Sequence, residues 1–233
     1  MSEPNLLRDT RNKIETALSP YISEPLEPFI ERLSNIYHSY EAERYDVYQH
    51  SLADAEQHWQ TILNQIPAPQ NAKLRLLDYG AGTGFATQQV LSSHLRSTIS
   101  EVVCYDLSRE MLNVCQQKFK SFDGVSFTFL DGQEGKKRLV QMDPFDLVVT
   151  NALLHHLLDL DQFCQAIGAF IRPSGYYLAG HEPNRLFYYN QTLLNWTYRF
   201  QKYKRLMQAF SLQYWAQKLR FKPRRPDLAT LTN

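Results

Sequence analysis

Residues 74–85 read Leu-Arg-Leu-Leu-Asp-Tyr-Gly-Ala-Gly-Thr-Gly-Phe, and this segment determines the architecture that the rest of the chain must fit. A short apolar run of strand length leads into Asp78, and glycines follow at positions 80, 82 and 84. Glycine has no Cβ, so the backbone of this loop can approach a ligand closely. The Asp78 carboxylate comes where a buried strand ends, and burying it is costly unless a cation or a hydrogen-bond donor meets it. The segment therefore predicts a strand followed by a ligand-binding loop.

The glycine pattern also indicates which kind of ligand the loop binds. A glycine loop with its own acid suits a ligand that carries an amine better than one that carries only phosphates, which favours S-adenosylmethionine. Dinucleotide-binding loops follow G-x-G-x-x-G, and the third glycine of that pattern is replaced here by Phe85. A nicotinamide-dependent oxidoreductase is therefore disfavoured, although it stays open, as does an ordinary tight turn.

Composition and charge describe a globular chain with two differently charged regions. The 233 residues suffice for one buried core, and 43% are hydrophobic and 21% charged, as in soluble proteins. The three scattered cysteines, the lack of a membrane-length apolar run and the lack of a signal peptide predict a cytoplasmic protein without a metal site. The net charge of +1 hides an asymmetry, because residues 183–226 contain ten Lys or Arg and no acid.

The periodicity of apolar residues divides the chain into three parts. Residues 1–70 predict a helical cap with helices at 5–18, 26–40 and 51–66. Residues 71–184 predict strands alternating with helices: strands at 74–79, 101–105, 125–130, 145–150 and 176–180, and helices at 85–94, 108–120 (capped by Ser108) and 161–171. This alternation predicts an α/β fold with a doubly wound, mostly parallel, Rossmann-like sheet that binds ligands at the carboxyl ends of its strands. Residues 185–233 predict a basic, aromatic, helical segment.

Polar residues follow the predicted strands at the ligand-binding edge. Asp106 ends the second strand, 26 residues after Gly80, where a carboxylate can accept hydrogen bonds from ribose hydroxyls. Asp131 follows the third strand, where it could take an adenine amino group, and Asn151 lies just past the fourth. These positions predict a nucleoside pocket.

Together these motifs resemble those of class I S-adenosylmethionine-dependent methyltransferases. The likeness covers about residues 73–184 and rests on five segments in order, at 78–84, 105–112, 129–132, 145–156 and 171–180. The resemblance implies a role for each of nine residues. The backbone of Gly80 and Gly82 would approach the methionine portion, Asp78 would influence its ammonium, and Asp106 would contact the ribose. The adenine would be contacted by Leu107, Asp131, Gly132 and Gln133, and Asn151 would lie near the reactive methyl.

The expected activity is methylation of a small-molecule acceptor at oxygen, nitrogen or carbon. Methyl transfer needs in-line positioning of the acceptor and, for an oxygen or nitrogen acceptor, a base. His155, His156 and Glu182 are the candidates. In the competing interpretation the histidines pack or cap the loop after the fourth strand, and Glu182 pairs with a cation such as Arg185. A catalytically inactive cofactor-binding or assembly module is the alternative function.

The last fifty residues depart from the family's usual domain. The family's final antiparallel strand pair has no counterpart in the sequence, so either the sheet ends early or the chain is a fragment. Basic and aromatic residues interleave in residues 185–225, which fits a solvated helix face or an anionic partner: a phosphorylated substrate, a carrier protein or a membrane surface. Nucleic acid is disfavoured because no recognition motif accompanies the charge. The oligomeric state is left open.

Overall fold

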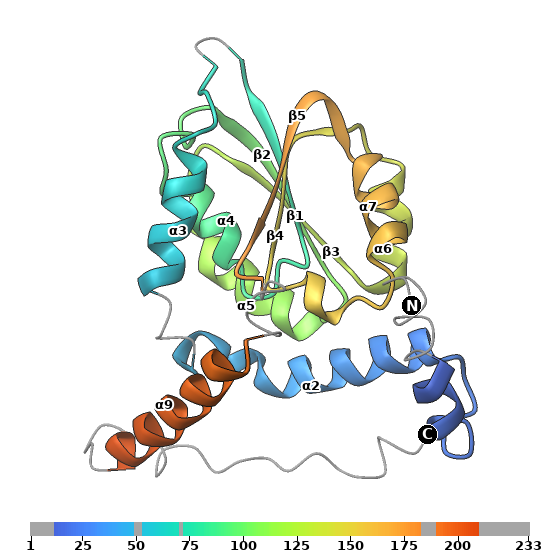
Figure 1. Cartoon of the computed structure of the whole chain (residues 1–233). Helices are drawn as coiled ribbons and strands as arrows, with labels where there is room; N and C mark the ends of the chain where they lie inside the picture. Colours follow the sequence, from blue (N-terminus) through green and yellow to red (C-terminus); the bar gives the residue numbers. More distant parts are fainter. Residues whose placement is uncertain (1–11, 49–52, 70–71, 183–189, 210–233) are drawn as a thin grey trace. The chain divides into compact units, whose positions relative to one another are not determined.

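The computed structural model describes residues 12–48, 53–69, 72–182 and 190–209. The chain divides into two compact units, Met1–Glu182 and Pro183–Asn233. Figure 1 shows the elements of both units.

The first unit is built on a five-stranded sheet in which every pair of neighbouring strands is parallel. The strands are β1 (Leu74–Tyr79), β2 (Ile99–Asp106), β3 (Ser126–Asp131), β4 (Phe145–Asn151) and β5 (Ile171–Gly180), in the order β3-β2-β1-β4-β5. The chain adds β2 and β3 on one side of β1 and then β4 and β5 on the other side. The strand order therefore reverses between β1 and β4, and their carboxyl ends lie side by side at this switch point. The predicted doubly wound, Rossmann-like sheet is confirmed.

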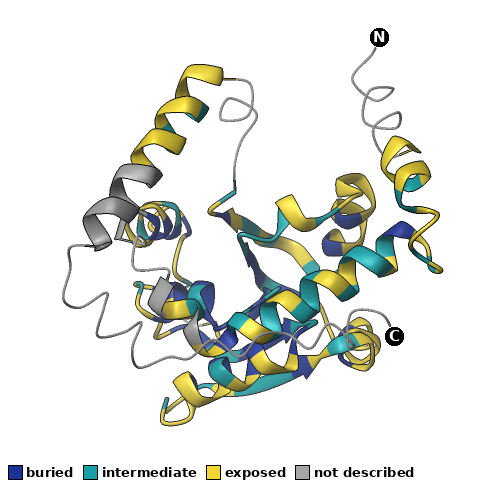
Figure 2. Ribbon diagram, turned by 90° about the horizontal axis from the view of Figure 1, so that it is seen from below, coloured by how far each residue is buried: buried dark blue, intermediate teal, exposed yellow. Residues whose placement is uncertain are grey.

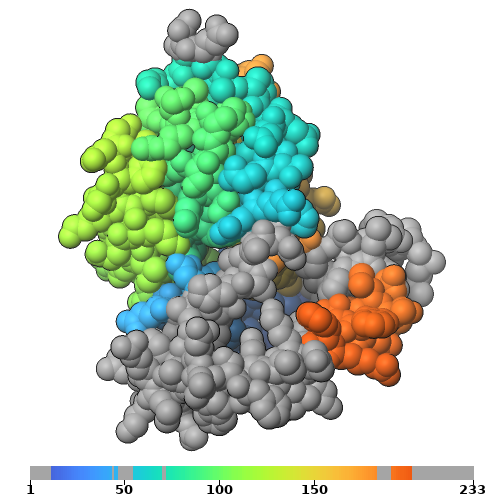
Figure 3. Space-filling view, turned by 90° about the vertical axis from the view of Figure 1, so that its left-hand side faces the viewer, coloured from blue at the N-terminus to red at the C-terminus, as the bar shows by residue number. Residues whose placement is uncertain are grey.

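Helices cover both faces of this sheet, because successive side chains of a buried strand point to opposite faces. Leu76 packs into a cluster with α3 (Ala53–Leu63), α4 (Phe85–Leu91) and α5 (Arg109–Phe119), whereas Leu77 packs into a second cluster with α6 (Gly132–Val140) and α7 (Leu160–Gly168). Figure 1 shows these two groups on opposite sides of the sheet, and Figure 3 looks onto the first face, where α3 lies beside α4 and α5.

A long helix, α2 (Leu26–Tyr48), crosses the carboxyl ends of the strands. It extends eight residues beyond the predicted end at Tyr40. Polar contacts hold its second half: Ser39 Oγ donates to Glu110 Oε2 of α5 at 2.7 Å, and Thr83 Oγ1 of the glycine loop donates to Asp46 Oδ1 at 2.6 Å. The other oxygen of Asp46 lies 2.8 Å from Lys118 Nζ of α5. Figure 2, seen from below, shows that the buried residues concentrate in the sheet, whereas α2 is largely half-buried or exposed. The helix therefore acts as a cover for the strand ends.

Strand β5 and helix α6 also differ from the sequence prediction. Strand β5 begins at Ile171 rather than at Tyr176, because the register passes from Phe145↔Ile171 to Leu147↔Tyr176 and the irregularity takes up Pro173. Proline is tolerated there because β5 pairs with β4 alone among the described strands and thus lies at the sheet's edge. Helix α6 starts directly after β3, where no helix was predicted; its polar sequence buries just Gly135 and Leu139.

The described part of the second unit is helix α9 (Gln191–Ala209), which lies in the segment predicted to be helical. Residues 5–11, Ser51 and the rest of the basic segment, including Arg185, lie outside the described residues. Among the helices that the structure describes, none has the length and apolar content that a membrane crossing requires.

Candidate functional site

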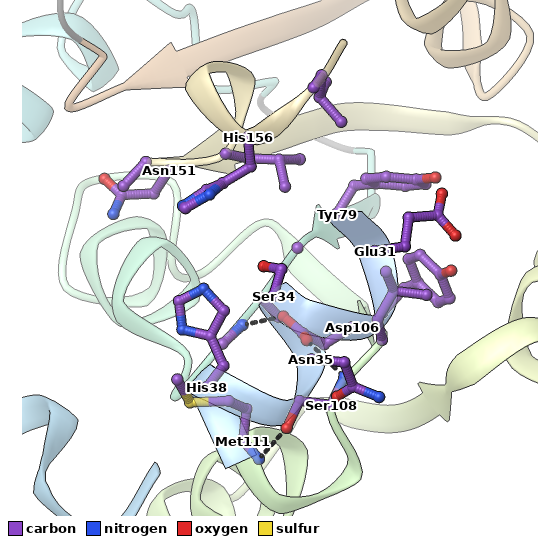
Figure 4. A pocket seen from close by; sticks show the side chains of 18 of the residues that line it. Glu31, Ser34, Asn35, His38, Tyr79, Asp106, Ser108, Met111, Asn151 and His156 are labelled. Carbon is purple, nitrogen blue, oxygen red and sulfur yellow. Dashed lines mark hydrogen bonds between the residues drawn. The ribbon is translucent and has the colours of Figure 1, made fainter. Parts of the chain in front are cut away.

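A cavity of 360 Å³ lies at the carboxyl ends of β1, β2 and β4, with α2 along one wall (Figure 4). Six of the residues predicted from the sequence line it together: Gly80, Gly82, Asp106, Leu107, Asn151 and His156. The other six, namely Asp78, Asp131, Gly132, Gln133, His155 and Glu182, do not line it. Helix α2 adds polar residues that the sequence did not single out, among them Glu31, Ser34, Asn35 and His38.

The glycine loop is tied to the end of β2 by its own backbone. The N–H groups of Gly80 and Ala81 donate to the carbonyl of Tyr105 at 2.8 and 2.9 Å. Two of the glycines show why other residues would fit poorly. Gly84 has a φ of 85°, and a Cβ there would lie 2.6 Å from Phe119, so a side chain would be both strained and obstructed. Gly82 also has a positive φ, but a Cβ there would meet nothing within 4 Å, so this glycine leaves open space above the loop.

Asp106 is the acid that organises this wall of the cavity. Its Oδ2 accepts the N–H of Gly82 at 2.7 Å, and its Oδ1 accepts the N–H of Ser108 at 2.8 Å. Burial raises the pKa of Asp106, while these two N–H groups and the nearby His38 oppose the rise. The carboxylate is therefore held in a fixed orientation at the cavity wall, where the ribose contact was expected.

Asp78 is buried behind the loop instead of facing the cavity. Its Oδ2 accepts the backbone N–H of Thr87 at 3.0 Å and the Thr87 hydroxyl at 2.7 Å, whereas its buried Oδ1 has no hydrogen-bond partner among the described residues. Burial raises the pKa of this carboxyl to about 6, although the Thr87 hydrogen bonds oppose the rise. In the structure Asp78 ties β1 to the first turn of α4, and its action on a ligand amine stays a prediction.

Asn151 is held by a residue that the sequence did not connect to it. The indole Nε1 of Trp59, on α3, donates to Asn151 Oδ1 at 2.8 Å, and the Trp59 side chain is 1% exposed. Gly180, the partner of Asn151 in the β4–β5 register, leaves room for the indole, because a Cβ there would lie 2.4 Å from the ring. The next residue, Ala152, has a left-handed φ of 53°, and its N–H donates to the Gly180 carbonyl at 2.9 Å. Strained backbone of this kind is frequent at functional sites.

The two histidines after β4 have different surroundings. Glu182 Oε1 accepts the N–H groups of Leu153 and Leu154 at 2.6 and 2.8 Å, and Glu182 Oε2 lies 2.9 Å from His155 Nδ1. Glu182 thus anchors the loop and orients His155. The His156 ring lies 4.3 Å from that of His155 between centroids and lines the cavity. Burial lowers the pKa of His156, and the neighbouring His155 lowers it further, so this imidazole is neutral at pH 7.

A third histidine, His38 on α2, completes this group. Its ring centroid lies 5.5 Å from that of His156 with the planes at 83°, and Figure 4 shows the two rings turned toward each other. Burial lowers the pKa of His38, against the opposing influence of Asp106. No local pattern marks His38 in the sequence, because its importance arises only when α2 is placed over the strand ends.

The loop after β3 contributes less than expected. Asp131 is exposed, its Oδ2 lies 3.7 Å from Arg109 Nε, and it stands at the start of α6. Lys136, one turn into that helix, lines the cavity instead. The adenine contacts expected of Asp131, Gly132 and Gln133 stay predictions.

The sheet order, the glycine loop and the acid after β2 define a Rossmann-like domain for a nucleoside-containing cofactor. Comparison with known proteins specifies the family: a model described as "Methyltransferase domain" matches residues 48–222, well over half of the chain. The chain belongs to this methyltransferase domain family, and its recognition as a class I S-adenosylmethionine-dependent methyltransferase domain is confirmed. S-adenosylmethionine is the cofactor of this class.

Individual relatives are more distant. The chain is 26% identical over 121 residues to the non-reducing polyketide synthase prhL of Penicillium brasilianum, a match that covers 51% of this chain and 5% of the synthase. It is 29% identical over 100 residues to malonyl-[acyl-carrier protein] O-methyltransferase of Halalkalibacterium halodurans, covering 43% of this chain and 36% of the relative. Among solved structures, phosphoethanolamine N-methyltransferase 1 of Haemonchus contortus aligns with a TM-score of 0.49 and 20% identity, over 68% of this chain and 34% of that one. The chain thus spans a small part of the curated relatives that it matches.

Proposed function

We propose that this domain transfers the methyl group of S-adenosylmethionine to a small-molecule acceptor, either free or attached to a carrier. The observation that carries the proposal is the pairing of the Gly82 N–H with the Asp106 carboxylate at the wall of the 360 Å³ cavity. It brings an open glycine backbone and a fixed acid together at the switch point of the sheet, where nucleoside cofactors bind in this architecture.

The residues around the cavity fit the cofactor. Gly82 leaves space above the loop for the methionine portion, and Asp106 presents an oriented carboxylate for the ribose hydroxyls. Leu107 offers an apolar surface for the adenine face, and Asn151, steadied by Trp59, lies at the end of β4 beside the region assigned to the reactive methyl. When bound, the cofactor supplies an electrophilic methyl group on a sulfonium, so the protein's task is to place the acceptor in line and to manage its proton.

His156 is placed to take that proton, because it is the candidate base that lines the cavity. Burial lowers the pKa of His156, so its ring is available to accept a proton from a bound acceptor. The carboxylate of Glu182 is fixed by two backbone N–H groups and contacts His155 Nδ1, and the His155 ring lies 4.3 Å from that of His156 between centroids. We assign His156 as general base, and His155 and Glu182 as the residues that position it.

Cofactor binding is tested by calorimetric titration of the full chain with S-adenosylmethionine. Asp106→Ala should weaken binding at least tenfold, since hydrogen bonds to a charged group contribute about 1.5–3 kcal/mol. Asp123→Ala, which removes an exposed acid in the turn before β3, is the matched control and should bind like the wild type. No binding by the wild type at millimolar ligand, or equal affinity for wild type and Asp106→Ala, would refute the assignment of the site.

The chemistry is tested by transfer of a labelled methyl group to a metabolite extract and to malonyl-[acyl-carrier protein], the acceptor named for one of the relatives. A general base contributes about 10²–10⁴-fold, so His156→Ala should lower kcat by at least a hundredfold and leave the cofactor Kd unchanged. His155→Ala and Glu182→Gln should lower kcat by a smaller factor, because they act through the position of His156. If His156→Ala retains full kcat, the base lies elsewhere, and if the wild type labels nothing, a non-catalytic binding module replaces the proposal.

A further inference from the structure

Helix α9 presents an apolar stripe to solvent. Leu193, Trp196 and Phe200 are separated by three and four residues, so they lie on one face of the helix. Their side chains are 44%, 69% and 60% exposed. Single exposed apolar residues are ordinary, but aligned large ones, two of them aromatic, indicate a surface that contacts something else.

The charge of the helix specifies the sign of that contact. The sequence of α9 contains Arg199, Lys202, Lys204 and Arg205 and no acidic residue. The surrounding segment 183–226 continues this bias, with ten basic residues and no acid. A partner that matches the helix must therefore combine negative charge with an apolar layer that can take up indole and phenyl rings.

We propose that α9 binds the surface of an anionic lipid bilayer and lies in the plane of the interface. Helices that carry Trp, Phe and Leu on one face and Lys and Arg elsewhere bury the apolar face at the boundary between headgroups and acyl chains, while their cations attract anionic lipids. A bilayer offers both components continuously along a helix of 19 residues, whereas an acidic protein surface offers charge but exposes apolar area only in limited patches. This inference does not depend on the proposed methyl transfer.

The test is co-sedimentation of the full chain with vesicles of pure phosphatidylcholine and with vesicles of equal parts phosphatidylserine and phosphatidylcholine. The protein should sediment with the anionic vesicles only, and raised salt should release it because screening weakens the attraction. The variant Trp196→Ala/Phe200→Ala should bind more than tenfold more weakly, since each large apolar side chain loses its burial. Arg199→Gln, which removes an exposed cation of the same helix, should weaken binding roughly fivefold, the contribution of one basic residue near an anionic surface.

Tyr198→Ala is the matched control. Tyr198 is an aromatic residue of the same helix, 74% exposed, but it lies two positions from both Trp196 and Phe200 and therefore points away from the stripe. Its variant should bind vesicles like the wild type. Unchanged circular dichroism and cofactor affinity would show that each variant is folded.

Three results would overturn the proposal. Equal sedimentation with neutral and anionic vesicles would remove the role of the basic residues. Equal losses for Tyr198→Ala and for the double variant would remove the role of the stripe. Failure to bind either vesicle, together with salt-sensitive binding to a purified acidic acyl carrier protein, would show that the partner is a protein.

Discussion

Replacing Gly180 with alanine should disturb the site through Trp59, although neither residue was expected to matter from the sequence. A Cβ at position 180 would lie 2.4 Å from the indole, and ordinary contact begins near 3.4 Å, so the ring must move by about 1 Å. Such overpacking costs about 1–3 kcal/mol. The movement also breaks the 2.8 Å hydrogen bond to Asn151, which contributes about 1 kcal/mol. We expect Gly180→Ala to lower the free energy of unfolding by about 2–4 kcal/mol.

Thermal and denaturant unfolding of the full chain measure this effect, and about 2–4 °C of melting temperature is expected per kcal/mol for a chain of this size. Gly168→Ala is the matched control. Gly168 is the last residue of α7, and a Cβ there would meet nothing within 4 Å. Alanine at that helical position should stabilise the protein by about 0.5–1 kcal/mol. The two glycine substitutions should therefore change stability in opposite directions.

A double-mutant cycle identifies the cause. In a Trp59→Leu background the indole is gone, so adding Gly180→Ala should cost much less than it does in the wild type, with a coupling energy of about 1 kcal/mol or more. Additive effects would show that the cost of Gly180→Ala has another origin. If Gly180→Ala itself has wild-type stability and wild-type cofactor affinity, the indole of Trp59 is not tightly packed between Gly180 and Asn151.

Three further substitutions test local features of the fold. Burial raises the pKa of Asp78 from 3.8 to about 6, so between these pH values the folded protein holds a proton that the unfolded chain has released. The free energy of unfolding should therefore fall by about 3 kcal/mol as the pH rises through this window. Denaturation curves of Asp78→Asn should lack this dependence on pH. Ser108→Ala removes the cap that accepts the Met111 N–H at 3.2 Å and should cost about 1 kcal/mol in unfolding free energy, whereas no cost would mean that the cap is not needed. Ala152→Gly relieves a φ of 53° and should raise the melting temperature by the equivalent of about 1 kcal/mol; a lower melting temperature would argue against strain at this residue.

Much of the fold could be predicted because its signals are local. The apolar run before Asp78 and the glycines after it mark one strand and its loop, and the capping residue Ser108 marks the start of α5, which the structure confirms. Parallel strands place all their carboxyl ends at one edge, so locating the strands also brought Asp106 and Asn151 to the same cavity. Helix α6 escaped prediction because its sequence is polar and contains two glycines, and a helix that buries so few residues has little apolar periodicity to detect.

The rest of the site depends on contacts between distant segments. Trp59 lies 92 residues before Asn151, and only the packing of α3 against the end of β5 brings the indole to the amide. Likewise His38 reaches His156 only because α2 crosses the strand ends, pinned to the glycine loop through Asp46. Neither residue belongs to a motif, since its position is set by tertiary packing rather than by spacing along the chain. The cofactor-facing wall is thus encoded in short segments of the sheet, whereas another wall comes from α2, and α3 reaches the site through Trp59. Differences in α2 and α3 can therefore change what the cavity accepts without altering the loop that defines the family.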